Sequence, residues 1–129
     1  GMGCGQSGKH KRTTKEAKKT DAKAEGKAAT DVKKPTILIA YYSTYGHIET
    51  MAGSVAEGVK SGGAKVKIMR IPETLGEEVL KKMHAKAKNP DHPVVTPEDI
   101  KGADGVIFGI PTRFGMASAQ VKALIDATG

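Results

Sequence analysis

The chain has few cysteines and few aromatic residues, and it has no long apolar run. Cys4 is the one cysteine among 129 residues, which excludes a disulfide within the chain and is compatible with a reducing compartment. There is no tryptophan, and only three tyrosines and two phenylalanines are present. The apolar runs are far shorter than the roughly 20 residues that a membrane-spanning helix needs. These features predict a cytoplasmic protein without a membrane span.

Positive charge is concentrated at the N-terminus. Residues 1–34 contain ten Lys or Arg and four Asp or Glu, whereas residues 35–129 contain eleven and ten, so the net charge of +7 belongs mainly to the first segment. That segment is rich in Lys, Ala, Thr and Gly and lacks aromatic residues, which is typical of disordered chains. We therefore predict a disordered basic tail over residues 1–34 and one folded domain over residues 35–129. Because this domain is nearly neutral, we expect no nucleic-acid partner for it.

The tail also carries a pattern for attachment to a membrane. Residues 2–7, MGCGQS, fit the N-myristoylation motif once the methionine is removed, with Gly3 as the acceptor of myristate and Cys4 as an acceptor of palmitate. Basic residues follow over residues 9–19. A lipid chain and a basic segment together give stable attachment to the anionic cytosolic face of a membrane. A flexible solubilising tail is the alternative interpretation, and nucleic-acid binding by the tail is a weaker third one.

The folded part is organised around residues 36–59. An unbroken apolar and β-branched run from Thr36 to Tyr42 predicts a strand that is buried on both faces of a sheet. The segment after it predicts a helix, because apolar residues recur on one face at helical spacing. These residues are Ile48, Met51, Ala52, Val55 and Val59.

Between this strand and this helix lies a hydroxyl-rich turn, residues 43–47, STYGH. Such a turn directs free backbone N–H groups and the positive end of the helix dipole at one point, which predicts a phosphate site. Residues 36–59 contain no Lys or Arg, so we expect N–H and O–H dipoles to hold the anion, which favours a monophosphate. The alternative is an ordinary turn in which Ser43 and Thr44 only cap the helix.

The same pattern recurs later in the chain. Residues 65–71 and 105–110 predict two further strands, and a polar turn, residues 111–115, follows the second of them. Helices are predicted over residues 75–86, after a cap at Thr96, and after the polar turn. Strand–turn–helix units of this kind predict an α/β fold with a parallel, doubly wound sheet, whose ligands bind where the carboxyl ends of the strands meet. The aromatic residues lie near the two turns, which favours a flat ligand; no spacing matches a metal site.

Four segments carry a resemblance to a known family. They are residues 41–52 (YYSTYGHIETMA), 72–75 (PETL), 103–116 (ADGVIFGIPTRFGM) and 124–129 (LIDATG). They are similar to the flavodoxin-like NAD(P)H:quinone oxidoreductases of the WrbA type, in particular to those of plants, over about residues 35–129. The resemblance implies FMN as cofactor, NAD(P)H and quinones as substrates, a sheet of order 2-1-3-4-5 and a homotetramer. It also implies ping-pong chemistry, in which the nicotinamide gives hydride to the flavin and leaves before the flavin reduces a quinone.

The resemblance also assigns residues to the flavin site. The FMN phosphate would be held by Ser43, Thr44, Tyr45, Gly46, His47 and Ile48. The ribityl chain and the isoalloxazine ring would lie along Pro111, Thr112, Arg113, Phe114 and Gly115. No residue is assigned a catalytic role, because the flavin itself does the chemistry.

The end of the chain departs from the family. The family continues with two more strands, a third flavin-contacting loop and a histidine near the ring, and none of these follows Gly129. We therefore expect the N-terminal portion of an FMN-dependent quinone oxidoreductase, with three of the five strands in the order 2-1-3. Two alternatives remain open: an electron-carrier flavodoxin, and a membrane-tethered FMN-binding or scaffold protein that does not catalyse.

Overall fold

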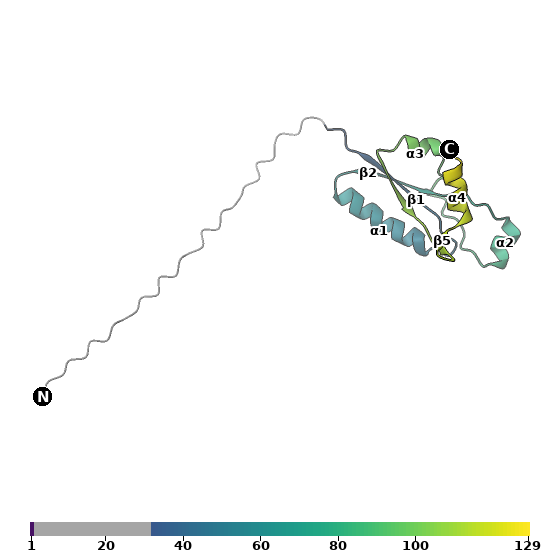
Figure 1. Cartoon of the computed structure of the whole chain (residues 1–129), viewed down its shortest axis with the longest axis horizontal. Coiled ribbons are helices and arrows are strands. Elements are labelled where there is room, and N and C mark those ends of the chain that lie inside the picture. Colours follow the sequence, from purple (N-terminus) through teal and green to yellow (C-terminus); the bar gives the residue numbers. More distant parts are fainter. Residues whose placement is uncertain (2–31) are drawn as a thin grey trace. The chain divides into compact units, whose positions relative to one another are not determined.

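The computed structural model describes residue 1 and residues 32–129. The predicted disorder of the tail and its lipidation sites, Gly3 and Cys4, lie outside the described residues. Residues 32–129 form one unit, which Figure 1 shows. Its elements are β1 (Thr36–Tyr41), α1 (His47–Ser61), β2 (Lys65–Arg70), α2 (Glu77–Lys82), α3 (Pro97–Lys101), β3 (Gly105–Gly109), β4 (Thr112–Arg113), β5 (Met116–Ala117) and α4 (Ala119–Asp126).

The main sheet has three parallel strands in the order β2-β1-β3. In the central strand, Ile39 pairs with Ile68 of β2 and with Ile107 of β3. This order and direction confirm the predicted α/β sheet, with three strands of a flavodoxin-like fold. β4 and β5 form a separate antiparallel hairpin, where the sequence predicts only a turn.

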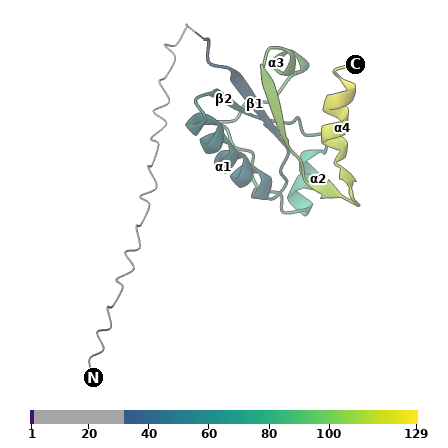
Figure 2. The same ribbon diagram turned by 60° about the vertical axis from the view of Figure 1, so that its left-hand side comes forward.

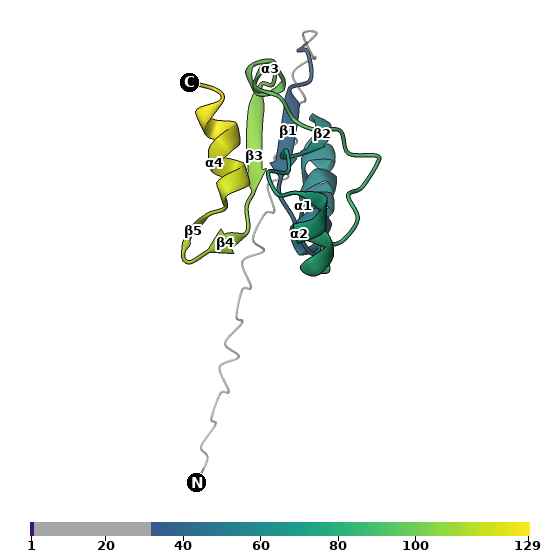
Figure 3. The same ribbon diagram turned by 90° about the vertical axis from the view of Figure 1, so that its right-hand side faces the viewer.

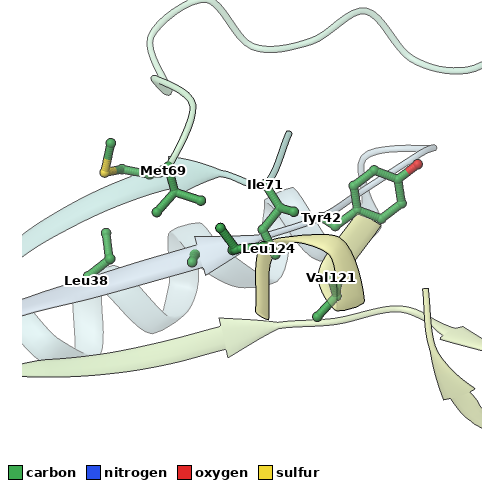
Figure 4. Close-up of a cluster of buried hydrophobic side chains, with 8 residues drawn as sticks. Leu38, Tyr42, Met69, Ile71, Val121 and Leu124 are labelled. Atoms are coloured by element: carbon green, nitrogen blue, oxygen red, sulfur yellow. The ribbon is translucent and has the colours of Figure 1, made fainter. Parts of the chain in front are cut away.

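β1 is buried on both faces because its alternate side chains enter two separate cores. One core lies between the sheet and α4, and Figure 4 shows its members converging there. Its buried residues are Leu38, Ala40, Tyr42, Met69, Ile71, Val95, Val121 and Leu124. The other core lies between the sheet and α1, with Ile39, Tyr41, Ala52 and Ala56. α1 and α4 therefore cover opposite faces of the sheet, as Figures 2 and 3 show.

The outer edge of β3 is the exposed side of the sheet. Ile107 and Phe108 are 39% and 40% exposed. The sequence places Met51 and Val55 on the buried face of α1, but both are exposed, and the helix buries Ala52 and Ala56. An apolar groove of about 230 Å³ runs between α1 and β3, and the exposed side chains of both elements line it. The predicted apolar face of α1 is thus only half covered within residues 32–129.

The first helix after β2 is shorter than the sequence pattern suggests. α2 was expected over residues 75–86, but it begins after Gly76 and ends at Lys82. The following residues leave the helix and return to the end of β1, where the Lys86 amide donates to the Thr44 carbonyl at 2.9 Å. α3 begins as predicted, since Thr96 and Asp99 cap each other's backbone amides. No helix within residues 32–129 has the length and apolar character that crossing a membrane requires.

Candidate functional site

The loops that follow β1 and β3 meet at the carboxyl edge of the sheet. The Tyr42 amide donates to the Gly109 carbonyl at 3.0 Å, so both loops start side by side. Arg113 Nη2 then donates to Thr44 Oγ1 at 3.1 Å, across 69 positions of the sequence. The structure thus brings together the two predicted site segments, residues 43–48 and residues 111–115.

The loop after β1 turns tightly into α1. Gly46 adopts a φ of +93°, a left-handed conformation that glycine adopts without strain. Its amide donates to Ser43 Oγ at 2.9 Å, which closes the turn. Gly46 is also the N-cap of α1, and within residues 32–129 no side chain accepts a hydrogen bond from the backbone amides of the first turn. The alternative in which Ser43 and Thr44 cap the helix is therefore wrong.

The first turn of α1 has unpaired donors. Within residues 32–129, no hydrogen-bond acceptor is found for the backbone amides of His47, Ile48 and Glu49. The amides of an uncapped first turn point along the helix axis toward the loop, where the helix dipole is positive. This geometry suits an anion at the start of α1.

Two cations reach this loop from other parts of the chain. Arg113 arrives from β4, and the side chain of Lys86 lies across Gly46: a Cβ atom on Gly46 would stand 2.7 Å from Lys86 Cδ and 3.2 Å from its Nζ. Hydrogen-bond dipoles are therefore not the only positive groups beside this loop, and the expectation that they alone hold the anion stays a prediction. Lys86 was missed because its position depends on where α2 ends, which no local motif encodes.

The other predicted residues of the first loop differ in exposure. Thr44 is buried, with its hydroxyl accepting from Arg113. Tyr45 and His47 are exposed, and Ile48 is half-buried. Ile48 packs closely on the end of β3, since a Cβ atom on Gly109 would stand 2.9 Å from Ile48 Cγ2. Glycine at position 109 therefore lets the start of α1 approach the second loop.

The second loop is a β-hairpin with an aromatic tip. Pro111 leads into β4, and Phe114 and Gly115 form a two-residue turn with φ of 52° and 76°. Positive φ at both positions is the turn geometry that matches the twist of two paired strands. Phe114 is fully exposed at the tip. The sequence signal for this hairpin is the glycine at the second turn position, whereas residues 111–115 were predicted only as a turn.

Two of the aromatic residues near the loops belong to the cores. Tyr41 bonds to His92 Nδ1 through its hydroxyl at 2.8 Å, and burial, followed by the charge of Glu49, raises its pKa to about 12. Tyr42 lies in the opposite core and donates to Glu73 at 3.1 Å. The rings that remain exposed in the two loops are those of Tyr45 and Phe114.

Glu73 joins the segments behind the site. Its carboxylate accepts from Lys88 at 2.8 Å, from Gln120 of α4 at 3.0 Å, from Tyr42 and from the amides of the next two residues. Burial by itself would raise the pKa of Glu73, but the bonds from Lys88, the Leu75 amide and Gln120 hold it below its ordinary value. This carboxylate is therefore ionised at neutral pH and fixes the end of β1 against α4.

The comparison with known proteins assigns the chain to a family. The model of the family described as NADPH-dependent FMN reductase matches residues 34–129, which include the sheet and both loops. The chain belongs to this family. The NADPH-dependent FMN reductase family implies FMN as cofactor, as the sequence analysis expected.

Two curated relatives are similar to part of this chain. A protein named quinone-oxidoreductase QR2, from Triphysaria versicolor, is 52% identical over 94 residues, which are 72% of this chain and 45% of that protein. A protein named NAD(P)H dehydrogenase (quinone), from Gluconacetobacter diazotrophicus, is 48% identical over 93 residues, 72% of this chain and 46% of that protein. The chain thus spans slightly less than half the length of these relatives. Their names agree with the predicted family.

The residues of the site fit the phosphate of FMN. Three unpaired amides, two hydroxyls and two cationic side chains meet at the start of α1, and all of them are donors that an anion can accept from. The exposed ring of Phe114 is held nearby by the bond between Arg113 and Thr44. Within residues 32–129, no three His, Cys, Asp or Glu side chains gather as a metal site.

Proposed function

We propose that the full-length protein is an FMN-dependent NAD(P)H:quinone oxidoreductase, with the flavin phosphate at the start of α1. The observation that carries this proposal is the set of unpaired first-turn amides beside the Arg113–Thr44 bond. The names of the two relatives support quinones and NAD(P)H as substrates. When bound, FMN accepts hydride from NAD(P)H and passes two electrons to a quinone.

The residues of this chain bind and orient the cofactor. The amides of His47, Ile48 and Glu49 and the hydroxyl of Ser43 would donate to the phosphate. Thr44 holds Arg113 by its Oγ1. Because Arg113 belongs to β4, this bond also sets the position of the hairpin. Pro111 to Gly115 would then border the ribityl chain and the ring of FMN.

Steady-state kinetics with the full-length protein decide between this proposal and its alternatives. We expect NAD(P)H oxidation that depends on a benzoquinone, with ping-pong kinetics, in a protein that shows the visible spectrum of a flavin. An electron-carrier flavodoxin would show the spectrum but no direct oxidation of NAD(P)H. A scaffold protein without catalysis would also leave NAD(P)H unchanged. Absence of quinone-dependent turnover in a flavin-loaded preparation contradicts the proposal.

The first prediction concerns the hydroxyls of the phosphate loop. Ser43→Ala and Thr44→Ala should each weaken FMN binding by about tenfold or more, since a hydrogen bond to a charged group is worth about 1.5–3 kcal/mol. Thr44→Ser keeps the hydroxyl and should bind nearly as wild type does. Ser61→Ala, at the opposite end of α1, is the control for a lost hydroxyl. Flavin fluorescence titration of the apo full-length protein measures all four, and equal affinities would contradict the assignment.

The N-terminal motif supports a second proposal, attachment to the cytosolic face of a membrane. A single myristoyl chain gives an association constant of only about 10⁴ M⁻¹, and nearby basic residues add about 1 kcal/mol each at an anionic surface. We predict that a protein starting at Met2 is recovered with membranes and that Gly3→Ala releases it. Gly8→Ala, outside the acceptor position, is the matched control. Equal solubility of wild type and Gly3→Ala after cell fractionation would rule the anchor out.

The resemblance also supports a homotetramer for the full-length protein. Light scattering of the full-length protein tests the assembly state, and a monomer would contradict this part of the proposal.

A further inference from the structure

We propose that Lys86 is a specificity residue of this site, which favours a flavin that carries a phosphate over one that lacks it. This inference rests on the proposed flavin site. Lys86 lies in none of the four segments that carry the family resemblance, and it reaches the site from the residues after α2. It therefore supplies charge to the loop independently of the loop's own sequence.

The backbone and the side chain of Lys86 both contact the phosphate loop. Its amide donates to the Thr44 carbonyl at 2.9 Å, which fixes the backbone beside the turn. Its aliphatic stem crosses Gly46, where any side chain on residue 46 would collide with it. Its Nζ then donates to Glu49 Oε2 at 3.1 Å. The ammonium group is thus held at the same turn of α1 that presents the unpaired amides.

Glu49 explains why a cation is needed here. It is the third residue of α1, and its carboxylate accepts from Lys86 and, at 2.9 Å, from Asn89 Nδ2. Burial would raise the pKa of Glu49, but the bonds from Lys86 and Asn89 outweigh it and hold the pKa below its ordinary value. Glu49 is therefore an anion at neutral pH. One helical turn is about 5.4 Å long, which is shorter than the Debye length of about 8 Å, so its charge acts on a phosphate at the loop.

Lys86 compensates the negative electrostatic potential that the Glu49 carboxylate creates at the start of α1. Without it, an uncompensated carboxylate would repel a phosphate at the start of α1; with it, the pair is neutral and the ammonium lies nearest the loop. A dianionic phosphate gains from this arrangement, whereas the uncharged ribityl end of riboflavin does not. The expected consequence is selectivity for FMN over riboflavin that depends on Lys86 and weakens at high salt.

If the ion pair between Lys86 and Glu49 had a purely structural role, its variants would change flavin affinity in a different way. If Lys86 only tethered residues 84–89 to the loop, breaking the pair from either side would have the same effect, and both flavins would lose affinity equally. If Lys86 acts through charge, removing the lysine and removing the glutamate have opposite effects on FMN. The two roles can therefore be separated by the direction of change in a pair of variants.

The experiment titrates FMN and riboflavin into the apo full-length protein and its variants by flavin fluorescence, at low and high ionic strength. Lys86→Met keeps the stem against Gly46 and removes the charge; it should bind FMN about tenfold more weakly at low salt and riboflavin as wild type does. Glu49→Gln should bind FMN at least as tightly as wild type. Lys86→Arg should restore most of the FMN affinity. Lys60→Met, in the last turn of α1, is the control with the same change in net charge.

The outcomes separate this inference from the proposed function. FMN binding by Lys86→Met equal to that of Lys60→Met overturns the role of Lys86 and leaves the flavin site intact. Equal losses for FMN and riboflavin, or a loss in Glu49→Gln as large as in Lys86→Met, also overturn it, because they indicate tethering. A wild-type protein that binds neither flavin overturns the proposed function and this inference together.

Discussion

At the scale of single residues, Glu73 shows how one carboxylate organises the protein behind the site. It receives bonds from three elements or loops that are far apart in the sequence. In Glu73→Gln, the new amide group would face Lys88 or Gln120, which are themselves donors. We predict that this variant loses about 1–3 kcal/mol of unfolding free energy. Urea unfolding of the full-length protein measures it, with Glu57→Gln on the exposed side of α1 as the control.

The loss of unfolding free energy in Glu73→Gln should also depend on pH. Because the pKa of Glu73 is lowered in the folded protein, its stabilisation is complete above the ordinary value of 4.5 and is lost as the pH falls through the lower folded value. The difference in stability between wild type and Glu73→Gln should therefore be large at neutral pH and small well below pH 4.5. A difference that stays constant over this range would show that Glu73 does not act as a carboxylate.

The residues of the site divide into those that local motifs reveal and those that they do not. Residues 43–48 and 111–115 follow strand ends, so their meeting was predictable from the direction of a parallel sheet. Lys86 and Glu73 were missed because their roles depend on the path of the loops around α2, which is set by tertiary contacts. The two tyrosines at the end of β1 were misjudged for a related reason: alternate strand positions send them into opposite cores.

At the scale of elements, the sequence predicts whether a segment is a helix or a strand better than it predicts where that segment begins and ends. Helical spacing located α1 and the direction of its apolar face, but the closest approach to the sheet falls on the small residues Ala52 and Ala56. Larger residues such as Met51 stand at the margin of the contact and stay exposed. α2 ends at Lys82 because His84 adopts a left-handed φ of 53° and the Lys86 amide donates to the Thr44 carbonyl instead of to a carbonyl of the helix. Periodicity carries no information about such a competing partner.

The hairpin β4–β5 is an element that no periodicity could reveal. Each strand has two residues, which is too short for any alternation to appear. An isolated hairpin of this size is marginal in water, so its position depends on tertiary contacts. The bond from Arg113 to Thr44 is such a contact, and it joins the hairpin to the phosphate loop. The element that carries the exposed ring of Phe114 is therefore ordered by the loop beside it.

At the scale of the whole molecule, the sheet is asymmetric. β1 is paired on both sides, whereas β3 is paired only with β1 within residues 32–129. The composition GVIFG is typical of a strand paired on both sides, yet its outer backbone groups and the side chains of Ile107 and Phe108 are accessible. The apolar groove between α1 and β3 continues this surface. Such an edge is a template for pairing with another chain.

We predict that the 129-residue chain, produced by itself, associates through the edge of β3. Phe108→Lys places a charge on this edge, which natural sheets use to prevent pairing, so it should lower the apparent mass and delay aggregation. Val32→Lys adds the same charge to an exposed apolar side chain outside the sheet and should leave association unchanged. Sedimentation velocity over a range of concentrations measures all three proteins. A 129-residue chain that sediments as a monomer at every concentration would contradict the prediction, and equal association of the two variants would place the contact elsewhere.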